Sequence, residues 1–175
     1  AAGAMAEYLA ALEVDPWFEA AAVNLAAVEA KVEGRERAIG RLREWVARDR
    51  GAAGAWARLG LFLDEDGDDA GALAAYDAAI AADPRQVVAL NNRGGILERR
   101  GEHQTAFEAY GAAIAVDPFY ARARFNLADL FFAFGQLGEA AEQYRIGLSL
   151  DPGNEQARRN LEEVEKSAGI ASIGP

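Results

Sequence analysis

Small, aromatic and aliphatic residues recur in this chain in columns that are 34 residues apart. The first column is alanine in all five copies, and tyrosine stands four positions later in all copies but one. A third column, mostly small, follows three positions further on, and an aliphatic residue comes directly after it. In chain order the four columns are Ala4, Ala38, Ala72, Ala106 and Ala140; Tyr8, Leu42, Tyr76, Tyr110 and Tyr144; Ala11, Trp45, Ala79, Ala113 and Gly147; and Leu12, Val46, Ile80, Ile114 and Leu148. Because steps of three and four mark one face of a helix, the pattern predicts the same amphipathic helix five times.

A second helix is expected upstream in each unit, centred on another column of small residues. That column reads Ala26, Gly60, Gly94 and Ala128. A glycine turn follows it, at Gly34, Gly67, Gly101 and Gly135. The dipeptide Asp-Pro recurs at Asp15-Pro16, Asp83-Pro84, Asp117-Pro118 and Asp151-Pro152. It ends a helix, because the residue before a proline avoids the α region. Each unit is therefore predicted as helix, glycine turn, helix and proline turn.

The unit at 53–86 resembles the tetratricopeptide repeat family most clearly. The matching residues are Trp56, Leu59, Gly60, Leu63, Gly67, Asp68, Ala72, Tyr76, Ala79 and Pro84. The resemblance extends in unbroken register over about residues 4–166. It implies an all-α fold in which antiparallel helix pairs stack into a right-handed α-solenoid, and it implies that the protein binds peptides or other proteins.

Stacked helix pairs contact only their neighbours, so one core can run the length of such a chain. We therefore expect residues 1–175 to form a single solenoid domain. Its predicted parts are a lone second helix of a truncated repeat (3–14), four full repeats (19–52, 53–86, 87–120 and 121–154), a capping helix (155–168) and a tail (169–175). Glu162 and Glu165 stand in apolar columns of the capping helix, which predicts that this face meets water.

The two ends of the chain leave alternatives open. The chain begins halfway through a repeat with a residue other than Met, which we interpret as a fragment whose first helix lacks a cover. Because exposed apolar patches mark contact sites, that end is a candidate surface for a homo-oligomer. At the other end, Ile170 and Ile173 lie in a tail that is either frayed or docked in the groove of the same solenoid or of a neighbouring one.

The acidic composition narrows the range of partners. The formal net charge is −10, so the chain gains nothing from phosphate neutralisation and we expect no nucleic-acid partner. It contains no run of eighteen apolar residues, so we expect no membrane insertion. Cysteine is absent, which excludes disulfides and thiolate metal sites. This is compatible with cytoplasm or periplasm, and the cytoplasm is the default expectation.

No group of residues indicates catalysis, a cofactor or a metal. The single histidine, His103, lies in a predicted turn without the positioned partner that a general base requires. The acidic cluster 64–69 contains a central glycine but is followed by no distal carboxylate, so it does not match a calcium loop. Gly94 and Gly95 lack the preceding strand and the following Gly-Lys-Ser/Thr of a phosphate loop. We therefore predict that the protein is not an enzyme.

One polar column has no explanation in the packing pattern. Two residues before the small column of each first helix stand Asn24, Arg58, Asn92, Asn126 and Asn160. Asparagine is a poor helix former, so its repetition requires a reason. The family resemblance implies that this column points into the concave groove, where the donor and acceptor of each amide would clamp an extended peptide backbone. The alternative is that each asparagine bonds within the helix stack and fixes the repeat spacing.

The resemblance implies further groove residues, which are Asn91, Arg122, Phe125, Asp129, Phe132 and Arg159. We expect Phe125 and Phe132 to be exposed anchors, because aromatic residues dominate binding hot spots. The leading function is a non-catalytic scaffold or adaptor that binds a protein or peptide segment in its concave groove. Two alternatives remain, which are the substrate-recruiting arm of a larger enzyme, such as a glycosyltransferase, and a self-assembly module.

The first full unit departs most from the pattern. Trp45 replaces a small residue, Glu29 replaces a large apolar one, and Arg50 stands in place of proline. Because a tryptophan cannot fill a gap sized for alanine without moving the helices, we expect an altered stacking angle beside the second unit. Arg93 and Arg124 also stand in apolar columns. We expect their aliphatic stems to pack while their charged heads reach water.

Overall fold

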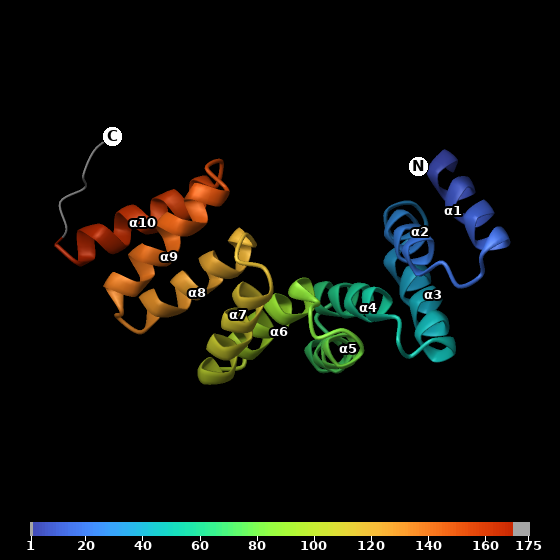
Figure 1. Cartoon of the computed structure of the whole chain (residues 1–175), viewed down its shortest axis with the longest axis horizontal. Helices are drawn as coiled ribbons and strands as arrows, with labels where there is room; N and C mark the ends of the chain where they lie inside the picture. Colours follow the sequence, from blue (N-terminus) through green and yellow to red (C-terminus); the bar gives the residue numbers. More distant parts are fainter. Residues whose placement is uncertain (1, 170–175) are drawn as a thin grey trace. The chain divides into compact units, whose positions relative to one another are not determined.

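The computed structural model describes residues 2–169, and every regular element in that range is an α-helix (Figure 1). The helices are α1 (Ala2–Val14), α2 (Glu19–Val32), α3 (Arg35–Arg48), α4 (Ala53–Glu65), α5 (Asp69–Ala82), α6 (Val87–Arg99), α7 (His103–Val116), α8 (Ala121–Ala133), α9 (Leu137–Leu150) and α10 (Glu155–Ser167). They form two compact units, Ala1–Arg93 and Gly94–Pro175. The chain is an all-α helical-repeat solenoid, as the 34-residue columns predicted.

The glycine turns follow one hydrogen-bonding pattern. Gly67, Gly101 and Gly135 have positive φ angles of 82°, 77° and 72°, which an L side chain rarely adopts. The residue after each glycine donates its backbone N–H to the carbonyl five positions earlier: Asp68 to Leu63 at 2.8 Å, Glu102 to Leu97 at 2.8 Å, and Gln136 to Phe131 at 2.9 Å. This is the Schellman arrangement that ends helices. The accepting carbonyls belong to Leu63, Leu97 and Phe131, which recur at every 34th residue as a column of large apolar side chains. The same residue therefore packs in the core and ends the helix.

The turns at the other end of each unit depend on aspartate as much as on proline. The carboxylate accepts a hydrogen bond from the backbone N–H two residues later: Trp17 to Asp15, Gly51 to Asp49, Arg85 to Asp83 and Phe119 to Asp117, each at 2.9 Å. Such an Asx turn redirects the chain without a proline. Asp49 therefore keeps the turn of the first unit although Arg50 stands where the other units have proline.

A side-chain donor closes the same turns from inside the next helix. Trp56 Nε1 donates to the carbonyl of Arg50 at 3.1 Å, and Arg124 Nη2 donates to that of Pro118 at 3.0 Å. Arg124 Nη1 also donates to the side chain of Gln143 at 3.1 Å. Arg93 Nε likewise donates to Asp77 at 2.7 Å, in a pair whose side chains are 28% and 59% exposed. Both heads are thus hydrogen-bonded at the surface, where the sequence predicted that they reach water.

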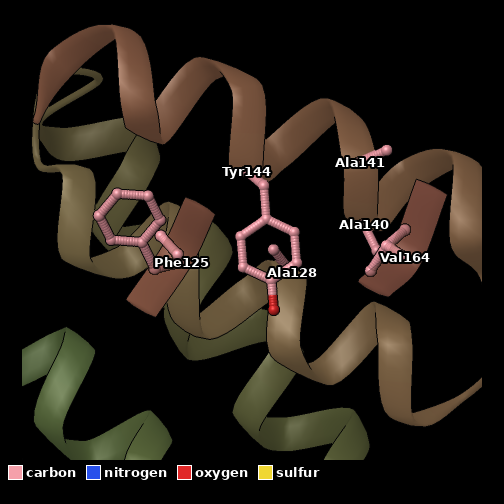
Figure 2. Packing of buried hydrophobic residues seen from close by; sticks show 7 residues of the cluster. Phe125, Ala128, Ala140, Ala141, Tyr144 and Val164 are labelled. Atoms are coloured by element: carbon pink, nitrogen blue, oxygen red, sulfur yellow. The ribbon is translucent and has the colours of Figure 1, made fainter. Parts of the chain in front are cut away.

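The core of the second unit is built where a tyrosine ring covers a small residue. Figure 2 shows Tyr144 of α9 lying against Ala128 of α8, with Phe125 beside them. At the corresponding position one repeat earlier, a Cβ atom on Gly94 would lie 2.6 Å from the Tyr110 ring. A Cβ on Gly147 would lie 2.4 Å from the Phe125 ring. The small residues are thus required by close contact with aromatic rings.

The last helix completes this core, and it is less solvated than its sequence suggested. Val164 of α10 is fully buried in the same cluster (Figure 2). Glu162 is exposed, as expected, but the Glu165 side chain is only 15% exposed and pairs with Arg145 Nη2 at 2.5 Å. The prediction that Glu165 faces water was therefore wrong, because its side chain is mostly covered and pairs with the half-exposed Arg145 of α9.

Candidate functional site

A polar groove lies between α8 and α10 in the second unit, with a volume of about 200 Å³. It is lined by Arg122, Phe125, Asn126 and Asp129 of α8, by Tyr144 of α9, and by Asn154, Gln156, Ala157 and Asn160 at the start of α10. Steps of four and three place Arg122, Asn126 and Asp129 on one face of α8. The structure therefore brings together the predicted residues of α8 and α10 in this groove, except Phe132 and Arg159.

The carboxylate of Asp129 is held by two neutral donors. The Tyr144 hydroxyl donates to Oδ1, and Asn160 Nδ2 donates to the same oxygen at 3.0 Å. Burial raises the pKa of Tyr144 well above its usual range, and the hydrogen bond to Asp129 adds to the shift. The phenol therefore stays protonated and remains a donor at neutral pH.

A second phenol and carboxylate pair lies in the same unit. The Tyr110 hydroxyl donates to Glu98 Oε2 at 2.7 Å. Burial is the main cause that raises the pKa of Tyr110, and the bond to Glu98 comes next. Each tyrosine thus has its ring under a small residue of the preceding helix and its hydroxyl on a carboxylate, which fixes that carboxylate in place.

The asparagine column has a structural partner that the sequence reasoning missed. Asn92 Nδ2 donates to the Tyr76 hydroxyl at 3.3 Å, and Asn160 Nδ2 donates to the Tyr144 hydroxyl at 3.2 Å. In both pairs the asparagine follows the tyrosine by sixteen residues. The sequence contained the signal, because Asn24 and Asn126 also follow a tyrosine at that distance, while Arg58 follows Leu42. The structure thus gives Asn92 and Asn160 a bond within the helix stack, which is the alternative that the sequence left open for this column.

Several predicted groove residues are less accessible than we expected. Phe125 is 8% exposed, because its ring covers Gly147, so the prediction of an exposed anchor was wrong for this residue. Asn91 is 2% exposed and donates to Asn92 Oδ1 at 3.0 Å. Phe132 is half-buried against the core cluster. Of these three residues, only Phe125 lines the α8–α10 groove.

Three of the remaining predicted residues, Asn24, Arg58 and Arg159, lie outside this groove. Asn24 is exposed on α2. The Arg58 guanidinium lies 6.0 Å from the centre of the Phe62 ring, as a cation–π contact. Arg159 is exposed, and its Nη2 donates to Gln156 Oε1 at 2.8 Å. Arg122 lines the groove; it is exposed and forms no ion pair with any residue that the structure describes.

Sequence reasoning missed a second hollow, of about 760 Å³, at the glycine turns of the second unit. Phe134 contacts His103 edge-on at 5.0 Å, and Phe107 contacts Phe131 in the same manner at 5.3 Å. His103 is exposed, as predicted, but it packs on a ring. Of the aromatic residues that make this hollow, Phe131 belongs to a recurring apolar column, but His103, Phe107 and Phe134 do not, so the repeat pattern did not reveal their cluster.

Neither metal binding nor membrane insertion finds support in residues 2–169. That range contains no group of three or more His, Cys, Asp or Glu side chains that could hold a metal ion. None of its helices is long and apolar enough to cross a bilayer.

The helix hairpins define a helical-repeat protein. The Tetratricopeptide repeat family matches residues 23–87, 70–115 and 96–155, and the chain belongs to this family. No curated protein matches the sequence.

Three solved structures illustrate the likeness. The crystal structure of MamA has 24% sequence identity and a TM-score of 0.69, and covers 87% of this chain and 89% of its own. YrrB, a TPR protein with an unusual peptide-binding site, has 20% identity and a TM-score of 0.72 over 94% of this chain and 85% of its own. The first TPR of Spaghetti (RPAP3), bound to the HSP90 peptide SRMEEVD, has 25% identity and a TM-score of 0.64 over 67% and 93%.

Proposed function

We propose that this protein is a non-catalytic interaction scaffold that binds an extended peptide segment of a partner protein in the groove between α8 and α10. The observation that carries the proposal is the lining of this groove, where charged and amide side chains of two helices face one hollow. Tetratricopeptide repeat proteins are interaction scaffolds, and an HSP90 peptide is bound to the RPAP3 domain that this chain resembles.

The groove offers the two kinds of contact that an extended peptide requires. A peptide main chain has a donor and an acceptor at each residue, and amides such as Asn126 and Gln156 can satisfy both. A guanidinium without an ion-pair partner, as on Arg122, can take a carboxylate in a bidentate geometry. The buried Phe125 ring keeps the floor rigid, so little ordering of the protein accompanies binding.

The test uses peptides selected from a random twelve-residue library displayed on phage, because no natural partner has to be assumed. Arg122→Gln should weaken the selected peptides by about tenfold, since a charge-assisted hydrogen bond contributes roughly 1.5–3 kcal/mol. Arg85→Gln removes an equally exposed charge outside the groove and should leave their affinity unchanged. The proposal fails if neither variant, or both equally, changes the dissociation constants measured by fluorescence anisotropy.

A further inference from the structure

Asp129 is the one carboxylate that lines the α8–α10 groove, and it forms no ion pair with Arg122, the cation that lines the same groove. Its hydrogen bonds come from the neutral groups of Tyr144 and Asn160. Among the described residues it has no ion-pair partner, although several arginines elsewhere pair with nearby acids. A carboxylate that is oriented inside a groove but left without a cation is complementary to a basic side chain.

We infer that the groove selects a peptide with a lysine or arginine that pairs with Asp129 and, three positions away in either direction, an acidic residue that pairs with Arg122. This inference rests on the proposed function, since it assigns the chemistry of the peptide that the same groove binds. It adds the basic residue and the spacing, which the family resemblance does not provide.

The geometry at Asp129 leaves room for a ligand donor. Both internal donors reach Oδ1, and Oδ2 accepts no hydrogen bond from the described residues. Two bonds on one oxygen fix the plane of the carboxylate, so the second oxygen is presented in a defined direction. An ammonium or guanidinium group can then bind without reorganising the protein, which is the condition for a strong charge-assisted contact.

The surrounding charge favours a cation at this end of the groove. The negative charge of Glu163 contributes to the raised pKa of Tyr144, and that of Asp129 contributes to the raised pKa of Tyr110. These acids lie in a chain whose formal net charge is −10. Arg122 is the only cationic residue among those that line the groove. The field therefore attracts a basic side chain to Asp129 and leaves Arg122 as the single position for an acidic one.

The spacing follows from the helix that carries both charges. Arg122 and Asp129 are seven residues apart, which is two turns and about 10.5 Å along the axis of α8. A polyproline II peptide repeats every three residues and advances about 9.3 Å in that distance, so positions i and i+3 face the same side. In a β-strand, side chains on one side are about 6.7 or 13.4 Å apart, which fits the two charges less well.

The experiment repeats the phage selection on the wild type, on Asp129→Asn and on Glu142→Gln. The amide introduced by Asp129→Asn keeps an acceptor for Tyr144 and Asn160, and Glu142 is an exposed acid on α9 outside the groove. The wild type and Glu142→Gln should enrich peptides that carry Lys or Arg three positions from Asp or Glu. Asp129→Asn should lose the basic residue, and thermal melts of all variants report whether the fold is kept.

A selected peptide and its Lys→Gln version then provide the quantitative test. The wild type should prefer the lysine peptide by about tenfold, and Asp129→Asn by less than about twofold, because the contact that discriminates is gone. The inference is wrong if the selected peptides lose affinity for Arg122→Gln but contain no basic residue, and if the wild type does not prefer the lysine peptide. The proposed function then stands. If Arg122→Gln also leaves the affinity of the selected peptides unchanged, the peptides do not bind in the α8–α10 groove. Both proposals are then wrong.

Discussion

The helix pairs α2–α3 and α8–α9 occupy the same repeat positions and solve the same packing problem with opposite chemistry. In α8–α9 a large Phe125 on the first helix covers Gly147 on the second. In α2–α3 the corresponding residues are Val23 and Trp45, so the bulk is on the second helix. The exchange does not conserve volume, because Val23 and Trp45 together are larger than Phe125 and Gly147, so the first pair accommodates more side-chain volume at this crossing.

The polar groups of the two pairs differ in a second way. In α8–α9 the buried polar atom is the phenol of Tyr144, which bonds to surface groups. In α2–α3 a charged side chain is buried outright: Glu29 is 1% exposed and accepts two hydrogen bonds from Arg41, at 2.7 and 2.6 Å. The bond to Glu29 is the main cause that raises the pKa of Arg41. The first pair thus depends on one bidentate contact where the fourth depends on ring packing.

The largest expected effect comes from separating that ion pair. Arg41→Met removes the partner of a buried carboxylate and should reduce the free energy of unfolding by about 3–5 kcal/mol, because the charge of Glu29 remains uncompensated. Urea denaturation followed by circular dichroism measures the change. The double variant Glu29→Met, Arg41→Met should be close to the wild type or more stable, since two apolar side chains replace the pair. If the double variant is as unstable as the single one, the ion pair is not what distinguishes this helix pair.

A smaller effect is expected in α8–α9, where space is limiting. Gly147→Ala places a methyl group 2.4 Å from the Phe125 ring and should destabilise the protein by about 1–3 kcal/mol. Gly111→Ala is the matched control, because a Cβ atom there meets nothing within 4 Å in the interior of α7. Removing that helical glycine should stabilise the protein by roughly 0.5–1 kcal/mol. If the melting temperature changes in the same direction for both variants, the close contact between Gly147 and the Phe125 ring is contradicted.

The repeat columns predicted the helices and turns because the same steric demands recur at every 34th residue. A tyrosine over a glycine, and a glycine with positive φ at a helix end, are local constraints that a single chain displays several times. No other unit has an acid and an arginine in the columns of Glu29 and Arg41, so repetition could not reveal this ion pair. Its two members also stand in columns that are apolar or unassigned in the other units, where each residue alone reads as a departure.

The candidate site was predictable in position but not in role. The family resemblance implied that Arg122, Asn126 and Asp129 share one face, and the groove contains all three. The resemblance could not tell that the ring of Phe125 turns inward, because that depends on Gly147 of another helix. Likewise, the role of Asn160 is set by Tyr144, and only a comparison of columns sixteen residues apart reveals the pairing.

The smallest change in unfolding free energy is expected at Trp45 of α3. It tests the comparison of the two helix pairs most sharply, because the indole Nε1 of Trp45 is buried without a hydrogen-bond partner among the described residues. Trp45 is 8% exposed, and its buried Nε1 forms no hydrogen bond with the described residues. Trp45→Phe loses apolar contact but also removes an unsatisfied donor, whose burial costs about 1–3 kcal/mol. The two terms should offset, leaving the unfolding free energy within about 1 kcal/mol of the wild type.

Trp56→Phe is the control, since Trp56 Nε1 has a partner in the carbonyl of Arg50. It should lose about 0.5–1.5 kcal/mol, although Trp56 is the less buried of the two. If Trp45→Phe instead has the lower urea midpoint of the two variants, stability follows burial. That result would show that the indole of Trp45 contributes a bond of its own.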